Sequence, residues 1–196
     1  MNAQLFKRKL AQVLPVFGLT ALLFTLLSNN LNAQTMKAKN VALVHGALMN
    51  GKEIISKFFE AQAKQDVQGM ADVLAENIVF EMPFALPGLP DRVEGKGTVV
   101  EFLERFLGKE RGMFTGWDLH NIRIYPGGEP DLVFAELDGQ GVVAQSGYQY
   151  RQKYIILFRV SDGRISHWRE YLNPIPLQEA IASMQTGQVQ SAHSRG

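Results

Sequence analysis

The sequence predicts an α+β domain, in which helices are segregated from a mostly antiparallel sheet. Three observations support this class. Apolar residues in the first half of the chain recur at three- and four-residue spacings, as on one face of a helix. In the second half they alternate with polar residues, which is typical of half-buried strands. Glycines inside these alternating segments indicate bends that let such a sheet curl around a cavity.

Three helices are expected beside the sheet. Lys52–Gln65 carries its apolar residues at helical spacing. Asp66 can cap a second, shorter helix through its side chain. Thr98 and Glu101 form a capping box, in which the threonine is the N-cap and the glutamate lies three residues later. This pair predicts a third helix that ends near Leu107.

One strand is predicted between the helices, and a meander of four strands follows them. Residues 83–91 contain three prolines, so they are expected to form a loop that could rim a pocket. Gly139 and Gly141 indicate a bulge or sharp bend, and Asp162-Gly163 is typical of a type I′ hairpin turn. The predicted strands are Asn77–Met82, Trp117–Tyr125, Asp131–Val143, Tyr148–Val160 and Arg164–Pro174.

The two ends of the chain are expected to lie outside this domain, which spans residues 52–184. Residues 1–33 are typical of a signal peptide, with a basic start at Lys7-Arg8-Lys9 and an apolar stretch over Val13–Leu27. A cleaved signal, an uncleaved anchor and a misread cytosolic helix all remain open, and the first two predict a periplasmic or secreted protein. Residues 34–51 are interpreted as a linker or arm. After a short helix over Pro174–Met184, residues 185–196 are predicted to be a disordered tail.

Composition narrows the function classes. The net charge is +1, and removal of the three basic residues of the signal segment leaves −2, so no nucleic-acid surface is expected. The chain has no cysteine, which excludes disulfides, thiolate metal sites and a cysteine nucleophile. Its four histidines show no spacing typical of metal ligands. We therefore predict no metal site.

The segment Arg164–Pro174 carries the best candidate for chemistry. Side chains alternate along a strand, so Glu170 shares a face with Trp168 and Leu172. In such apolar surroundings the charged form of a carboxyl group is disfavoured and its pKa rises. A carboxyl group tuned in this way can exchange protons near neutral pH. The alternative is a structural ion pair with an arginine such as Arg159 or Arg169.

The order of these elements resembles the nuclear transport factor 2-like superfamily, and within it the SnoaL-like and phenazine biosynthesis A/B-like proteins. The resemblance depends on short motifs, whose order and spacing cover about Ile54–Ala182. They are Glu136–Gly141 (ELDGQG), Asp162–Ile165 (DGRI), Arg169–Asn173 (REYLN) and the proline-rich Glu81–Lys96.

This resemblance implies a cone of three helices packed in a strongly curved sheet around a central pocket. It also implies a homodimer, a small hydrophobic carbonyl ligand and no metal or cofactor. In the phenazine A/B-like proteins the glutamate at the position of Glu170 is a proton-transfer acid. Those proteins also place a histidine on the helix matching Gly97–Leu107, where this chain has Phe102 near the expected position.

Aromatic residues complete the predicted site. Tyr154, with Tyr150 as a second candidate, would donate a hydrogen bond to a developing oxyanion, because their strand pairs with that of Glu170. Both could instead be ordinary core aromatics. His120 and Asp118 could form an acid–base pair or simply lie on a solvent-exposed face. The residues expected to line the pocket are Phe84, Trp117, Tyr150, Phe158 and Trp168.

Three functions remain open at this point. The chain could be an exported, cofactor-free isomerase, cyclase or dehydratase that uses Glu170 as its acid and base. It could be a non-catalytic module that binds a small hydrophobic molecule in the same fold. It could also be a protein-interaction module using the outer face of the sheet. A membrane contact is expected only through the signal segment, if it stays uncleaved.

Overall fold

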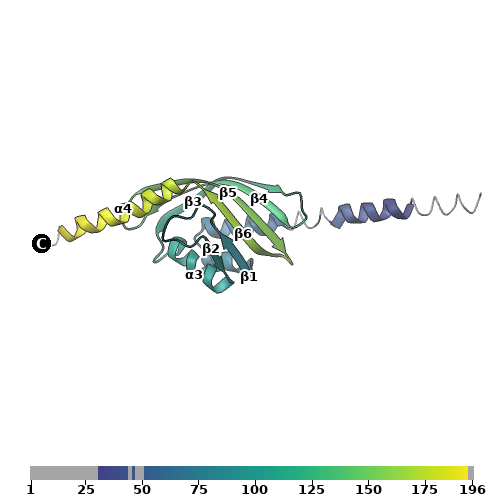
Figure 1. Cartoon of the computed structure of the whole chain (residues 1–196), viewed down its shortest axis with the longest axis horizontal. Coiled ribbons are helices and arrows are strands. Elements are labelled where there is room, and N and C mark those ends of the chain that lie inside the picture. Colours follow the sequence, from purple (N-terminus) through teal and green to yellow (C-terminus); the bar gives the residue numbers. More distant parts are fainter. Residues whose placement is uncertain (1–30, 44–45, 47–50, 194–196) are drawn as a thin grey trace, which may run out of the picture. The chain divides into compact units, whose positions relative to one another are not determined.

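The structure is a computed structural model that describes residues 31–43, residue 46 and residues 51–193 (Figure 1). Most of the predicted signal peptide therefore lies outside the described residues. Residues 31–43 and residues 51–193 belong to two separate compact units. Residues 31–43 form an exposed helix, so residues 34–40, interpreted as a polar linker, are helical here. Among the described residues, no helix is both long and apolar enough to cross a membrane.

The second unit is the predicted α+β domain, and its core is a curved six-stranded sheet with strand order β2-β1-β6-β5-β4-β3. Only the contact between β1 and β6 is parallel. The meander from β3 to β6 is antiparallel throughout, as its alternating pattern predicts. The strands are β1 (Leu74–Glu81), β2 (Arg92–Glu94), β3 (Phe114–Pro126), β4 (Leu132–Val143), β5 (Gln149–Ser161) and β6 (Arg164–Leu172).

Helices cover the inner face of this sheet. Residues 51–63 are helical, and their Phe58 ring contacts the rings of Phe158 on β5 and Trp168 on β6, with centroid distances of 5.7 and 5.0 Å. The short α2 (Val67–Asp72) begins as predicted, because the Asp66 side chain accepts a hydrogen bond from the backbone N–H of Gly69. The core of the domain therefore lies between the helices and the concave side of the sheet.

The start of α3 (Lys96–Leu107) differs from the prediction. The helix begins two residues before Thr98, and its N-cap is Gly95, which makes no side-chain capping bond. Gly95 has a positive φ of 82°, a conformation that glycine adopts at little cost. This turn leads directly from β2 into the helix, so the capping box has no role in starting it.

The C-terminal helix α4 (Pro174–His193) is longer than predicted. Residues 185–193, predicted to be a disordered tail, are helical in the structure. The physical reason lies in their composition, because this stretch contains no proline and only one glycine, so nothing in it stops a helix.

Buried and more exposed residues alternate along β4 and β5, so one face of the sheet is buried and the other is more exposed. The Asp162-Gly163 turn has positive φ at both positions, 51° and 71°, as predicted for a type I′ hairpin.

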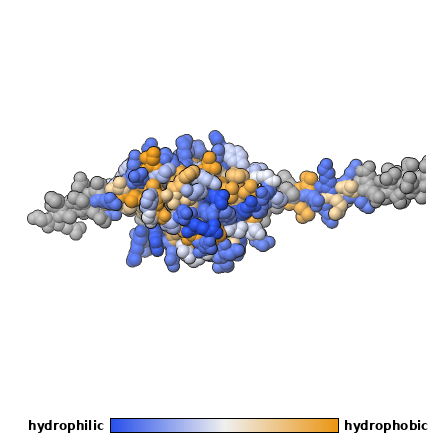
Figure 2. All heavy atoms as spheres, viewed as in Figure 1, coloured by the Kyte–Doolittle hydropathy of each residue, from blue (hydrophilic) through white to orange (hydrophobic). Residues whose placement is uncertain are grey.

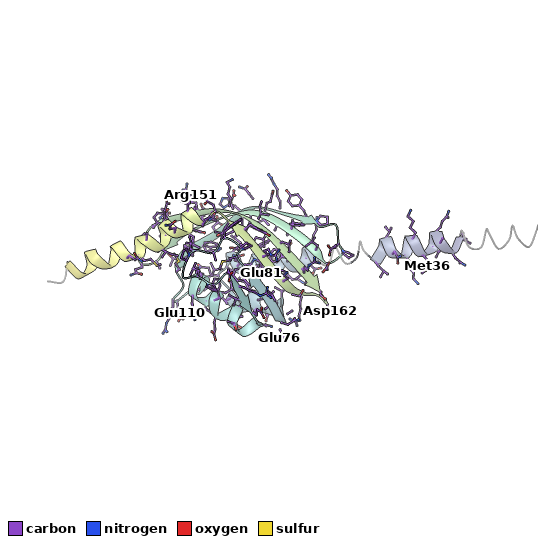
Figure 3. The ribbon with its side chains drawn as sticks, viewed as in Figure 1. Met36, Glu76, Glu81, Glu110, Arg151 and Asp162 are labelled. Carbon is purple, nitrogen blue, oxygen red and sulfur yellow. The ribbon has the colours of Figure 1, made fainter. Side chains whose placement is uncertain are left out.

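Figure 2 shows hydrophilic side chains gathered over the middle of the domain in one view, with apolar side chains around them. In the same view Glu110 and Asp162 lie at opposite ends of the domain (Figure 3).

Candidate active site

Glu170 is placed by β6, whose side-chain alternation is interrupted once. Val160 pairs with Ile165 and Arg159 pairs with His167, so Ser166 is an extra residue on β6. Strict alternation would place Ile165 and Trp168 on opposite faces of the strand, but the bulge leaves both side chains buried in the core. Beyond the bulge the prediction holds. Trp168, 2 % exposed, faces inward with Glu170, and Arg169 faces outward.

The Glu170 carboxyl group is held without a counter-charge. Burial raises its pKa to about 8, and a weaker interaction with the Trp168 indole lowers it only in part. The side chain keeps some accessible surface even though protein atoms surround its carboxyl group. In the described residues, Glu170 does not form the alternative ion pair with Arg159 or Arg169. Arg159 bonds Glu129 and Asp131, and Arg169 bonds Glu81 on the outer face.

The two candidate tyrosines lie together inside the sheet. Their hydroxyl oxygens are 3.2 Å apart, and both rings are buried. Burial raises the pKa of Tyr150 to about 12 and that of Tyr154 well above its usual value, and the nearby charge of Glu170 adds to both shifts. Both hydroxyls are thus protonated near neutral pH. One hydrogen is used between them, so the other hydroxyl remains able to donate.

Two glycines make room for the aromatic rings of this region. A Cβ atom on Gly139 would lie 2.9 Å from the Tyr154 ring, and one on Gly141 would lie 2.9 Å from the Trp117 ring. The pairing of β4 with β5 is continuous at these glycines. The predicted irregularity lies on their other side, in the pairing of β3 with β4, where the register shifts opposite Gly141 and Gly116 on β3 has a positive φ.

Three polar atoms of the inner core have no hydrogen-bond partner in the described part of the chain. They are the indole N–H groups of Trp117 and Trp168 and the side-chain oxygen of Gln62. Buried polar groups are usually paired, so each of these calls for a partner such as water or a ligand. Gln62 lies one helical turn after Phe58, which contacts Trp168. The inner face therefore offers two unpaired donors and one unpaired acceptor.

Gln62 was not predicted as a site residue. Its spacing from Phe58 and Phe59 matches the buried face of a helix, and the sequence offers no other signal that its amide faces the core. Phe158, by contrast, was predicted as a wall, and its ring stands beside the Trp168 ring at 6.3 Å.

Phe84 lies apart from the rings around Trp168. Its side chain is 58 % exposed and its ring contacts Tyr171, which follows Glu170 and faces the opposite side of β6. The proline-rich loop thus carries Phe84 to the outer face, where it lines a hollow of about 680 Å³ to which Tyr154 and Leu172 also contribute. His120 and Asp118 also lie outside this group of rings. They pair with each other at 3.4 Å on a solvent-exposed face of β3.

The interior beside Glu170 is filled by aromatic rings. Phe102, which lies near the position expected for the histidine of phenazine A/B-like proteins, contacts Phe80 at 5.3 Å, and Phe80 contacts Trp168 at 4.2 Å. The surface hollows of the described residues include four of about 400 to 680 Å³, and Glu170 lines none of these four. No group of three or more potential ligands in the described residues could hold a metal ion.

Comparisons with known proteins agree with this architecture. The family model described as "SnoaL-like domain" matches residues 55–168, and it ends two residues before Glu170. A phenazine A/B-like protein of Pseudomonas aeruginosa, itself uncharacterised, is 31 % identical over 137 residues, which are 70 % of this chain and 94 % of that protein.

Two crystal structures show the same fold. A Bacillus subtilis protein provisionally named an isomerase is 28 % identical, with a TM-score of 0.64 over 70 % of this chain and 96 % of its own. A phenazine biosynthesis-related protein of Pseudomonas aeruginosa has a TM-score of 0.61 over 71 % of this chain and 89 % of its own, and its 20 % identity supports the fold alone.

Proposed function

Because this chain belongs to the SnoaL-like domain family, we propose that it binds a small hydrophobic carbonyl compound on the inner face of its sheet and that Glu170 transfers a proton on it. One observation carries this proposal. Glu170 is an inward-facing carboxyl group without a counter-charge, and its pKa of about 8 suits it to give and take protons near neutral pH.

The reaction class follows from the groups around Glu170. A carboxylate can remove a proton from a carbon next to a carbonyl group or an imine, and the resulting acid can return it at another atom. Negative charge develops on the carbonyl oxygen during this step, and a nearby N–H or O–H donor stabilises it. The free hydroxyl of the Tyr150–Tyr154 pair is one donor within this region. The N–H of Trp168 is another, and it interacts with the Glu170 carboxyl group although it forms no hydrogen bond of normal geometry. The step needs no cofactor.

The names of similar proteins support the same class of chemistry. One structural relative is provisionally named an isomerase, and another similar protein is a phenazine A/B-like protein. A non-catalytic binding module is the second candidate, and one observation favours it. The helix that matches the histidine-bearing helix of phenazine A/B-like proteins has no histidine, and Phe102, near the expected position, packs its ring against Phe80.

An isotope-exchange experiment on the full chain separates the two. In D2O, with 2-tetralone as the probe, NMR follows loss of the protons next to the carbonyl group. We expect faster exchange with the wild type than in buffer, and a loss of about 100-fold or more in Glu170→Gln. Glu136→Gln, an exposed outer-face control, should keep the wild-type rate. Binding of the probe to both wild type and Glu170→Gln without any exchange would reject the catalytic function and support the binding module.

Export and a homodimer complete the proposal. The signal-like residues 1–33 support a periplasmic or secreted location. Ile155 on β5 is 53 % exposed beside Tyr171, and Phe84 lies against the same outer face, so this surface offers apolar area to a second copy. Cell fractionation and the light-scattering mass of the released protein test these two points.

A further inference from the structure

A second hollow of about 680 Å³ lies beside the end of α3, at the opposite end of the domain from the Asp162-Gly163 turn (Figure 3). The proline-rich loop, α3 and α4 all contribute to it. Most of its lining is apolar, and these residues are Leu89, Pro90, Phe102, Phe106, Met113 and Met184. The rings of Phe102 and Phe106 stand 4.7 Å apart and form one wall. An apolar hollow of this size suits a small organic molecule.

Two arginines line the same hollow, and neither is paired with a carboxylate in the described part of the chain. Arg105 lies in the last turn of α3 and Arg111 follows the helix, and both are exposed. In the described part of the chain neither side chain forms an ion pair or hydrogen bond, although Glu110 also lines the hollow. Arg92 and Arg159, by contrast, each bond two carboxylates. The charge of Arg105 also suits the end of a helix, but Arg111 has no such role.

We propose that this hollow binds a hydrophobic carboxylic acid, with its apolar body against Phe102 and Phe106 and its carboxylate at Arg105 and Arg111. Guanidinium groups pair with carboxylates through two parallel hydrogen bonds, so an unpaired arginine pair beside an apolar wall favours this class over a neutral ligand. Glu110 supplies one opposing charge, which the two arginines outnumber.

A chain of ring contacts links the hollow to the strand of Glu170. Phe102 contacts Phe80, and Phe80 contacts Trp168, whose neighbour on the inner face of β6 is Glu170. The inference rests on the proposed function in one respect: the carboxylic acid bound in the hollow is taken to be the carbonyl compound on which Glu170 acts. The proposed substrate would then carry a carboxylate.

Calorimetry on the full chain tests this with a matched pair of probes, 1-naphthylacetate and 1-naphthylacetamide, which differ in charge but hardly in shape. At low salt we expect 1-naphthylacetate to bind about five- to ten-fold more tightly than 1-naphthylacetamide, as for a charge pair near a surface. The double variant Arg105→Gln/Arg111→Gln should abolish this preference and leave the affinity for the amide unchanged. Glu110→Gln should increase the preference.

A matched control is Arg123→Gln, an exposed arginine that lines the outer-face hollow, and it should change neither affinity. Equal affinity for the two probes, or absence of binding by either at millimolar concentration, would overturn the inference. The outcome is separable from the proposed function. Loss of the acid preference with proton exchange intact rejects this site alone, whereas acid binding without any exchange rejects only the role of Glu170.

Discussion

Glu81 and Glu170 lie on neighbouring strands of one sheet, yet their carboxyl groups have pKa values of about 2 and about 8. Glu81 ends β1 on the outer face. Glu170 lies on β6 on the inner face, next in sequence to Arg169, the residue that bonds Glu81. Burial acts in the same direction on both groups, since it raises the pKa of each. The difference therefore has two sources: the Glu170 carboxyl group is buried far more deeply, and only Glu81 has cationic partners.

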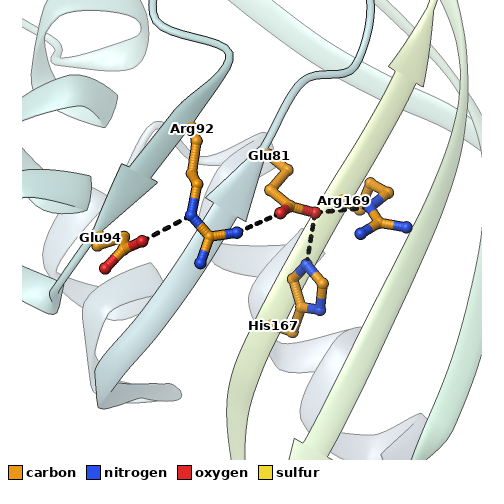
Figure 4. A network of polar contacts seen from close by, with 5 residues as sticks. All are labelled: Glu81, Arg92, Glu94, His167 and Arg169. Atoms are coloured by element: carbon orange, nitrogen blue, oxygen red, sulfur yellow. Dashed lines mark hydrogen bonds and ion pairs between the residues drawn. The ribbon is translucent and has the colours of Figure 1, made fainter.

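The partners of Glu81 form a network across three strands (Figure 4). Burial alone would raise the pKa of Glu81, but hydrogen bonds from Arg169 at 2.6 Å and His167 at 2.9 Å lower it to about 2. Arg92 bonds the same carboxylate and also Glu94. Because Arg169 is held on the outer face by Glu81, no cation of β6 is left for Glu170. The ion network on one face thus helps to keep the acid on the other face unpaired.

The largest effect is expected when Glu170 is replaced by glutamine. The pKa of Glu170 is raised from 4.5 to about 8 on folding, so between these pH values the unfolded chain releases a proton that the folded chain retains. Stability should therefore fall as pH rises through this window. We expect Glu170→Gln to be more stable than the wild type at pH 9, on the order of 2–4 kcal/mol, and similar at pH 5.

Urea unfolding of both proteins at the two pH values measures this difference. The comparison between variants cancels the titration of all other groups. A wild type and a variant with parallel pH profiles would mean that Glu170 is solvated in the folded protein, and the contrast with Glu81 would disappear.

The second effect concerns Glu81→Gln. The pKa of Glu81 is lowered on folding, so its contribution to stability is present above pH 4.5 and is lost as pH falls towards 2. The variant leaves Arg92 and Arg169 with a neutral partner and should lose about 2 kcal/mol at pH 7. This value is below that for a fully buried pair, because 16 % of the Glu81 side chain reaches solvent.

Glu53→Gln is the matched control, since Glu53 pairs with Lys57 on an exposed helix surface and its loss should not be measurable. Carboxyl-carbon NMR of Glu81→Gln adds a sharper test, because Glu170 should keep its raised pKa. A fall in that pKa would show that Arg169, once released, reaches the inner face.

The parts of this site that follow local rules could be predicted from the sequence, and those that depend on distant partners could not. Alternation from Trp168 to Leu172 predicts the inward direction of Glu170, and the type I′ turn before it follows from Asp162-Gly163. The Ser166 bulge has no local signal, because it appears only when β5 and β6 are aligned. Likewise β2 has three residues, too few for an alternation to be recognised.

Partners from remote segments were missed for the same reason. Arg169 is 88 residues from Glu81 in the chain, and nothing in either motif links them. The outward direction of Phe84 depends on its contact with Tyr171, which the composition of the proline-rich loop does not reveal.

The smallest effect is expected from Tyr154→Phe. This variant tests whether the raised pKa of Glu170 depends on the tyrosine hydroxyls or on burial of the carboxyl group. The change removes one hydroxyl hydrogen bond and should cost about 1 kcal/mol in the free energy of unfolding. The hydrogen bond from Tyr154 lowers the pKa of Tyr150, so that pKa should rise further, which ultraviolet titration would detect. Tyr125→Phe, which removes an exposed hydroxyl bonded to Glu136, is the control and should leave Tyr150 unchanged.

Burial is the dominant cause of the raised pKa of Glu170, and neither tyrosine contributes to it. Glu170 should therefore keep a pKa of about 8 in Tyr154→Phe, as measured by carboxyl-carbon NMR. A return towards 4.5 would mean that loss of the hydroxyl admits water to the inner face. In that case the tyrosine pair is what keeps the acid desolvated, and the contrast between Glu81 and Glu170 depends on the tyrosines as well as on the placement of Arg169.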